Sequence, residues 1–359
     1  MNKKSIFIGL ENVAGNIYHI ANALRTVGVD AKSYSFKQHS FGYQQDVLLK
    51  LWRPNKKHKL FQKLYINKYT IKWVNAFLRF YYFLSLLDKY EEFFFVSRFT
   101  FFKNNTDLKI LKLLNKKTYI FFTGCPERDP YDQINNRDGG ICRTCDDEGK
   151  KKFCKCYQPR IKEKMIRNIE KHSEIIFAHR DTTGFLFDRE KVKKIYLISE
   201  SMSDDTNNKF SNIVKINIAH FPSNRLLKGT KYVEAAIEEI SNKKIKYISK
   251  RVQNSELLKI LEKTHILIDQ FGPGPGLLAV EAMSRGCVVI CRLAKWFKED
   301  YPDIPIVSCE PEELKEVLED LINNPEKMKS IAHQSIQYYK KYHTPEAVGN
   351  YYKKILNLH

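Results

Sequence analysis

Two basic residues, a glycine-rich loop and one glutamate occur in residues 218–290 in an order that suits nucleotide binding. Arg225 and Lys228 follow an apolar segment expected to be a β-strand, so their cationic groups can meet a diphosphate. The glycine loop then enters a predicted helix, whose first N–H groups attract phosphate. Glu281 lies about one and a half turns into that helix, where it can accept hydrogen bonds from ribose hydroxyls. The residues predicted to contact the ligand through the loop are Gly272, Gly274, Gly276 and Leu277.

The same segment resembles the donor half of GT-B glycosyltransferases, in particular the retaining family 4, or group 1, transferases. The matching residues are HFPSN at 220–224, Arg225, Lys-Gly-Thr at 228–230, Glu-Ala-Met at 281–283, and Gly286 before an apolar strand. The resemblance implies two doubly wound, Rossmann-like parallel sheets facing a cleft, and a nucleotide-diphosphate sugar as donor. It also implies retention of anomeric configuration.

One position departs from that family. Its members commonly carry a second glutamate eight positions before the one at 281, which contacts the donor sugar, and this chain has Pro273 there. The cations would still neutralise the charge that builds on the departing diphosphate, without need of a metal. The sequence therefore predicts nucleotide binding more directly than the identity of the sugar or the acceptor.

Length and composition indicate two domains. The chain has 359 residues, of which 43% are hydrophobic and 13% aromatic, enough for two buried cores. We expect an acceptor-type domain at 1–199, a polar linker at 200–212 and a donor domain at 213–343. By the resemblance, a last helix at 344–359 returns to the first domain.

Residues 1–199 alternate predicted strands and helices, which is typical of a parallel doubly wound sheet with ligands at the carboxyl ends of its strands. Gly15 and Asn16 follow the first strand. The resemblance places such a loop near the donor phosphates or the acceptor, and an ordinary turn remains the alternative. The candidates for a general base are His19, His179 and His220, which could equally be packed or capping histidines.

Four of the eight cysteines form a C-x2-C-x8-C-x-C cluster, in a Cys-rich loop expected at 125–156. Close pairs of thiolates suit tetrahedral zinc in a reducing compartment, and four sulfurs leave no open position for catalysis. An iron–sulfur cluster, labile disulfides and free thiols remain open, and Cys125 could replace one ligand. The predicted structural zinc ligands are Cys142, Cys145, Cys154 and Cys156.

Residues 47–87 contain nine Lys or Arg and no Asp or Glu. Aromatic residues recur at four-residue intervals among these cations, namely Phe61, Tyr65, Tyr69, Trp73 and Phe77. Such a segment could lie on an anionic membrane, or its aromatic stripe could pack in the core with a solvated basic face. Binding of single-stranded nucleic acid is a third interpretation, but no groove-reading motif supports it.

The leading hypothesis is a glycosyltransferase of surface-polysaccharide biosynthesis that acts on a glycan or lipid-linked hydroxyl. Because no stretch of eighteen uncharged apolar residues occurs, we expect a cytoplasmic protein, with peripheral association at the inner face of the cell membrane. Two alternatives remain. A noncatalytic GT-B nucleotide-sugar-binding partner would explain Pro273, and a zinc-bearing nucleic-acid binder would explain the net charge of +20.

Overall fold

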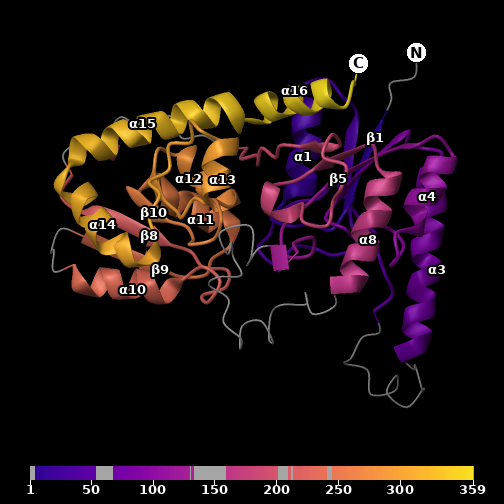
Figure 1. Ribbon diagram of the computed structural model, residues 1–359, viewed down its shortest axis with the longest axis horizontal. Coiled ribbons are helices and arrows are strands. Elements are labelled where there is room, and N and C mark those ends of the chain that lie inside the picture. The colour runs from indigo at the N-terminus through magenta and orange to yellow at the C-terminus, as the bar shows by residue number, and fades with distance from the viewer. Residues whose placement is uncertain are drawn as a thin grey trace.

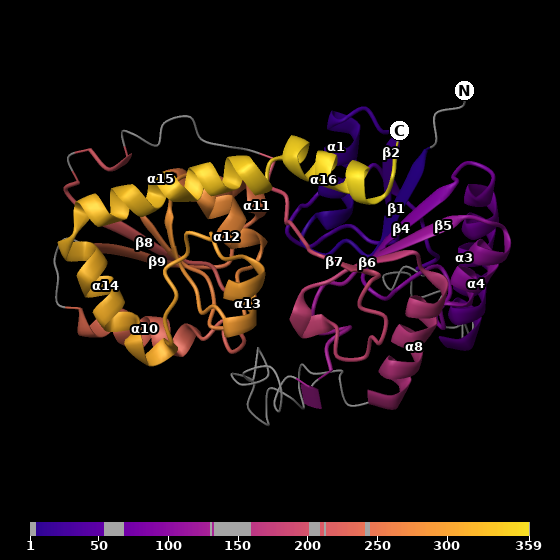
Figure 2. The ribbon, with the colours of Figure 1, turned by 45° about the horizontal axis from the view of Figure 1, so that its top comes forward.

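The computed structural model describes residues 5–53, 68–129, 131–132, 159–200, 209–211, 213–240 and 245–358. Two α/β domains lie side by side, each built on its own parallel sheet (Figure 1). The last two helices of the chain follow each other, one along the second domain and the other along the first (Figure 2). The doubly wound architecture expected from the alternation of strands and helices is confirmed.

The first sheet has seven parallel strands in the order β3-β2-β1-β4-β5-β6-β7. Its central strands are almost continuously apolar; β4, for example, reads EFFFV and is buried throughout. Such strands are expected where helices cover both faces of a parallel sheet. The strands are β1 (Ile6–Leu10), β2 (Ala31–Ser35), β3 (Val47–Leu48), β4 (Glu92–Val96), β5 (Lys117–Phe121), β6 (Ile175–Phe177) and β7 (Val192–Lys193).

Alternate residues of these strands feed two separate cores. Phe93 and Phe95 join one cluster, whereas Phe94 and Val96 join the other, as the two-residue period of a strand requires. The first cluster is covered by α3 (Lys68–Leu87), α4 (Thr106–Leu113) and α8 (Pro159–His172). The second is covered by α1 (Asn16–Thr26) and α16 (Pro345–Ile355).

The second sheet has four parallel strands in the order β11-β10-β8-β9. They are β8 (Ile216–His220), β9 (Ile245–Ser249), β10 (Ile266–Ile268) and β11 (Val288–Ile290). The α-helices of this domain are α10 (Thr230–Glu239), α11 (Asn254–Glu262), α12 (Leu277–Met283), α13 (Lys295–Asp300), α14 (Leu314–Asn323) and α15 (Pro325–Tyr342). Two short 3-10 helices complete the description: η1 (Arg180–Thr182) in the first domain and η2 (Pro311–Glu313) in the second.

The last helix belongs spatially to the first domain. Thr344 caps α16 by accepting a 3.1 Å hydrogen bond from the Ala347 N–H, and Pro345 occupies its first turn. Tyr352 is fully buried in the core beside α1. A Cβ atom on Gly349 would lie 2.2 Å from the Ala23 carbonyl oxygen, so glycine lets the two helices approach closely.

Several elements escape the sequence patterns. The two-residue edge strands β3 and β7 are too short to show a period, and the six-residue α13 carries too few apolar positions. The expected linker falls largely outside the described residues. No helix in the described part of the chain is long and apolar enough to cross a membrane.

Candidate functional site

Two adjoining cavities lie between the domains, at the carboxyl ends of both sets of strands. Their volumes are about 290 and 300 Å³, and Ala14, Gly276 and Leu277 line both. Ala14 comes from the loop after β1, whereas Gly276 and Leu277 begin α12. The two cavities are therefore parts of one cleft and join at the start of α12. We call the first, which Asp181 and Thr182 of η1 line, the η1 cavity. The second, which Asn254 and Leu257 of α11 line, is the α11 cavity.

Lys228 lies at this junction. Its ammonium group forms a 2.8 Å ion pair with Asp269, a buried residue directly after β10. The other carboxylate oxygen of Asp269 accepts a 2.9 Å hydrogen bond from the Gly276 N–H. One buried acid thus fixes both the cation and the entry to α12, and it holds Lys228 at the wall of the α11 cavity.

Arg225, the other predicted cation, lies differently. One guanidinium nitrogen contacts both carboxylate oxygens of Glu234 on α10, at 2.6 and 2.8 Å, and the side chain is 62% exposed. Arg225 is not among the residues that line either cavity. A contact with a ligand in the cleft would require this exposed ion pair to open.

Glu281 lines the α11 cavity and is almost fully buried. Asn254, the first residue of α11, donates a 2.8 Å hydrogen bond to its carboxylate. Burial raises the pKa of Glu281, while the Asn254 hydrogen bond opposes that shift. The carboxylate therefore sits in a poorly solvated site, where an added hydrogen-bond donor is strongly favoured.

The loop after β2 reaches from the first domain onto this carboxylate. The Tyr43 hydroxyl accepts a 3.1 Å hydrogen bond from the Asn254 amide. Its pKa is raised by burial and then by the charge of Glu281. The Asn254 N–H also donates to the Phe41 carbonyl at 3.3 Å, and the Arg251 guanidinium lies 4.6 Å from the centre of the Phe41 ring. Both domains consequently contribute to the wall of the α11 cavity.

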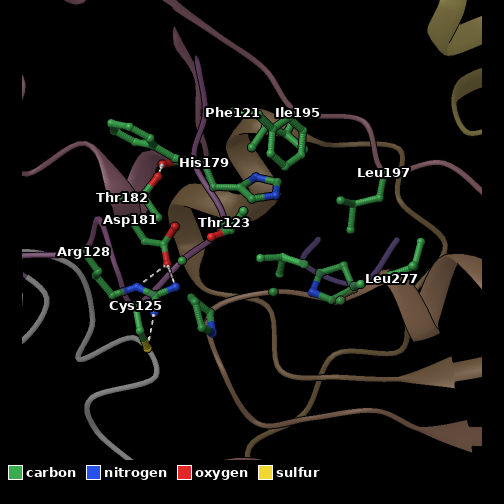
Figure 3. Close-up of a pocket in the computed structure, with 18 of the residues that line it drawn as sticks. Phe121, Thr123, Cys125, Arg128, His179, Asp181, Thr182, Ile195, Leu197 and Leu277 are labelled. Carbon is green, nitrogen blue, oxygen red and sulfur yellow. Dashed lines mark hydrogen bonds and ion pairs between the residues drawn. The ribbon is translucent and has the colours of Figure 1, made fainter. Parts of the chain in front are cut away.

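The η1 cavity has a charged wall in the first domain (Figure 3). Arg128 forms a buried ion pair with Asp181 of η1, with its Nε 2.7 Å from the carboxylate. A second Arg128 nitrogen lies 3.2 Å from the Cys125 sulfur. Lys162 donates hydrogen bonds to the Cys125 and Arg128 carbonyls at 3.0 and 2.8 Å. These contacts hold the loop after β5 against η1.

Glu127 supports the same loop from behind. It is fully buried, and it accepts hydrogen bonds from the N–H groups of Thr123 and Gly124, at 3.1 and 3.0 Å. Ser97 after β4 donates to it at 2.7 Å. Glu127 is therefore a positioning residue that fixes the floor of the cavity.

His179 points into the η1 cavity beside Thr123 and Ile195 (Figure 3). Burial lowers its pKa, and the nearby Asp181 carboxylate only partly offsets this effect. The ring is therefore neutral at physiological pH. Tyr301 of the second domain lies 3.4 Å from its Nδ1, which leaves this histidine at the contact between domains.

The other histidines considered as bases are packed. His220 is fully buried, and its two ring nitrogens contact the Ile268 carbonyl at 2.8 Å and the Thr230 hydroxyl at 2.9 Å. His19 pairs with Glu200 at 3.2 Å. Of these three described histidines, His179 alone lines either of the two cavities of the cleft.

The glycine loop forms the opposite wall of the η1 cavity. Pro273, Gly274, Gly276 and Leu277 line it, whereas Gly272 does not. Gly274 packs under the Phe297 ring, which a Cβ atom would approach to 2.5 Å. The glycine at 274 thus serves close packing, and the wall carries a proline where the resemblance implies an acid.

The loop after β1 contributes the remaining predicted residues. Asn16 lines the η1 cavity and is nearly buried. Gly15 adopts a positive φ of 76° at the start of α1, in close contact with Tyr43 and His19. Gly15 therefore shapes the loop, while Ala14 and Asn16 face the cleft.

The zinc prediction lies outside the described residues, because Cys142, Cys145, Cys154 and Cys156 all do. Within the ranges that the structure does describe, no group of three or more His, Cys, Asp or Glu side chains could hold a metal ion. Structural zinc at the four cysteines stays a prediction.

Sequence patterns missed Asp269, Asn254 and Tyr43. Asp269 had a usable signal, because a polar residue directly after a buried strand lies at the ligand-binding edge of a parallel sheet. Asn254 and Tyr43 had none. They are 211 residues apart and meet only because the two domains close on each other.

No protein-family profile matches the chain, and no curated protein matches it at a significant level. Solved structures do match over its whole length. Anabaena HepE, in complex with UDP and glucose, has 12% identity and a TM-score of 0.63, covering 99% of this chain and 100% of HepE. Sucrose-phosphate synthase from Thermosynechococcus elongatus has 11% identity and a TM-score of 0.63, with coverage of 99% and 98%.

A glycosyltransferase from Rickettsia africae gives 13% identity and a TM-score of 0.60, with 99% of both chains covered. At these identities the likeness concerns the fold. It agrees with the two parallel sheets, of seven and four strands, that face each other across the cleft. The chain therefore has the two-domain GT-B fold.

Proposed function

We propose that the protein is a glycosyltransferase that moves a sugar from a nucleotide diphosphate to a hydroxyl of a glycan or lipid-linked acceptor. The observation that carries this proposal is the cleft, in which the cavity of Lys228 and Glu281 joins a second cavity at Gly276 and Leu277. A nucleotide and the sugar attached to it need two such connected spaces. The names of the similar structures, among them HepE with UDP and glucose, support the same reaction class.

Four of the predicted residues take roles in this proposal. Lys228 neutralises the diphosphate as it leaves, and Arg225 assists after releasing Glu234. Glu281 accepts hydrogen bonds from the ribose hydroxyls. His179 is placed to meet the sugar or the incoming hydroxyl, at the charged wall of Arg128 and Asp181. These charges are supplied by side chains, so the transfer step needs no metal.

The resemblance supports retention of anomeric configuration, with the leaving phosphate accepting the proton of the incoming hydroxyl. Surface-polysaccharide assembly with peripheral membrane association is the setting that the basic aromatic segment suggests. A second candidate function is a noncatalytic nucleotide-sugar-binding partner. It is favoured by Pro273, which lines the cavity in place of an acid that could hold the sugar.

Calorimetry with UDP, GDP and ADP tests the nucleotide site. We expect Lys228→Ala to weaken binding of the preferred diphosphate by about tenfold to a hundredfold, since a charge-assisted contact contributes roughly 1.5–3 kcal/mol. Lys215→Ala is the matched control, because Lys215 is exposed and precedes β8, at the edge of the sheet away from the cleft. Equal affinity of both variants would contradict the assignment of Lys228.

Turnover of nucleotide sugars separates the two candidate functions. The transferase should release nucleotide diphosphate from a donor, slowly with water and faster with an acceptor. The Glu281 role is tested by a cycle in which Glu281→Ala and a 2′,3′-dideoxy nucleotide are combined. Because both changes remove the same contact, their effects should not add. Tight binding without any turnover would favour the noncatalytic partner.

A further inference from the structure

Helix α3 lies on the outside of the first domain (Figure 1). It exposes a row of large apolar side chains there. Trp73 is 75% exposed, Phe77 68% and Tyr69 66%. The buried face of the helix is limited to its C-terminal half, where Phe83 and Leu86 join the core. For these described aromatic residues, the core-packing interpretation of the stripe is therefore wrong. The exposed set is Tyr69, Trp73, Val74, Phe77, Phe80, Tyr81 and Leu84.

The spacing of these side chains makes one continuous surface. Residues three and four apart lie on the same side of a helix, so the series from Tyr69 through Trp73, Phe77 and Phe80 to Leu84 runs along α3. At 1.5 Å per residue, the row is about 22 Å long. Scattered apolar residues are normal on a protein surface, but a contiguous row of this size marks a binding surface.

Several exposed cations border the row. Helix α3 contains no Asp or Glu, and its Lys72 is exposed next to Trp73. Lys50 and Arg53, also exposed, are held alongside because the Tyr82 hydroxyl donates to the Lys50 carbonyl at 2.9 Å and the Trp52 N–H donates to Asn75 at 2.8 Å. An apolar row bordered by cations is complementary to an anionic surface with an apolar interior.

We propose that the outer face of α3 docks on an anionic lipid bilayer, with Tyr69, Trp73 and Phe77 inserted at the interface and Lys50, Arg53 and Lys72 among the headgroups. Tyr and Trp favour the interface between headgroups and hydrocarbon. Nearby cations add attraction to anionic lipid. A second copy of this chain is disfavoured as the occupant, because the chain carries a net charge of +20 and like charges repel.

The position of α3 connects this surface to the cleft. In a parallel sheet, a crossover helix runs opposite to its strands, so α3 starts at the carboxyl edge. The loop after β5, which contributes Thr123 and Cys125 to the η1 cavity, leaves from the same edge. This inference rests on the proposed function in one respect: a lipid-linked acceptor would reach the cleft from the docked side.

Vesicle sedimentation of the full chain tests the docking surface. The probes are vesicles of phosphatidylcholine alone and of phosphatidylcholine with phosphatidylglycerol. We expect binding to the anionic vesicles about tenfold above that to the neutral ones, and a decrease as salt rises. The fluorescence of Trp73 should shift to shorter wavelength on binding, because the chain's other tryptophans, Trp52 and Trp296, are less exposed.

Two variants and a control locate the surface. Trp73→Ser combined with Phe77→Ser removes apolar contact, and Arg53→Gln combined with Lys72→Gln removes charge. Each pair should lower the bound fraction by about fivefold or more. Leu113→Ser is the control, because Leu113 is 72% exposed on α4 and lies outside the row. Circular dichroism verifies that each variant is folded.

Other outcomes overturn the proposal. Unchanged vesicle binding by both variant pairs would exclude docking through α3, and equal binding to neutral vesicles would overturn the assignment to an anionic bilayer. A dimer in solution that the Trp73 and Phe77 changes dissociate would assign the surface to a second copy, and loss of oligonucleotide binding would assign it to nucleic acid. Nucleotide-sugar turnover without vesicles, measured on the same proteins, tests the proposed function separately from the docking.

Discussion

At the scale of single residues, the cleft is held by polar groups that already satisfy one another. Asp269 holds Lys228, and Asn254 with Tyr43 surrounds the buried carboxylate of Glu281. A bound nucleotide must therefore exchange existing hydrogen bonds for new ones. The net change is small for each such exchange, which makes the affinity sensitive to any group that competes for the same carboxylate.

Tyr43→Phe should strengthen nucleotide binding. Removal of the hydroxyl takes away a competitor of the ribose for Glu281, and a hydrogen bond to a charged group contributes roughly 1.5–3 kcal/mol at most. Because part of this is recovered by water, we expect a gain in affinity of about threefold to tenfold in calorimetry. Tyr82→Phe, which removes a hydroxyl far from the cleft, should have no effect. A loss of affinity in Tyr43→Phe would mean that the hydroxyl binds the ribose.

At the scale of elements, the C-terminal helix α16 completes a core whose other residues come mostly from the first 200 residues of the chain. Val348 and Tyr352 of α16 pack with Ile17 and Leu24 of α1 in the first domain. The close approach at Gly349 fixes the distance between the two helices. Because α1 starts at Gly15 and Asn16, the placement of α16 also sets the loop that lines the cleft.

Gly349→Ala should destabilise the protein, although alanine favours a helix over glycine by about 1 kcal/mol. The new methyl group would meet the Ala23 carbonyl at 2.2 Å, and overpacking of this kind costs about 1–3 kcal/mol beyond the propensity gain. Urea denaturation measures the change. Asn350→Ala, at an exposed position on the same helix, should be neutral or slightly stabilising. A more stable Gly349→Ala protein would show that the helices can separate without loss.

At the scale of the whole molecule, the irregular segment that follows β7 is bound by side chains from the second domain and the C-terminal helices. The carbonyls of Lys194 and Ile195 accept hydrogen bonds from the Tyr351 and Tyr301 hydroxyls, at 3.0 and 2.9 Å. Next to them, His343 donates to the Leu197 carbonyl at 2.7 Å. Across the same contact, Arg180 pairs with Glu299 and Asp300 on α13. These contacts fix the relative position of the domains and hence the width of the cleft.

His343 should make stability depend on pH. Burial lowers its pKa to about 4, whereas in the unfolded chain it is about 6.5. As the pH falls from about 6.5 towards 4, the unfolded chain takes up a proton that the folded protein does not, so stability decreases, by roughly 2 kcal/mol at about pH 5. His343→Gln, which can still donate to Leu197, should lose this part of the pH dependence. Urea midpoints of both proteins near pH 7.5 and 5 measure it, and parallel pH profiles would contradict the prediction.

The sequence by itself determined the parts of this protein that depend on neighbours along the chain. Strands such as 92–96 are apolar throughout because helices cover both faces of the sheet, and that pattern is visible without coordinates. The order of Lys228, the glycine loop and Glu281 was readable because one domain supplies them all. Thr344 and Pro345 marked the start of α16 through local capping.

Only the tertiary structure decided what depends on distant contacts. Tyr43 reaches Asn254 and Glu281 because two domains close on each other, and no periodicity records that approach. Arg225 is suited to phosphate by its type and position, but it pairs with Glu234, which lies nine residues later on α10. The aromatic row of α3 has the spacing of a core-facing helix, but a helix period shows only which side chains share a face. Whether protein or solvent lies against that face is set by the sheet and helices that pack around it.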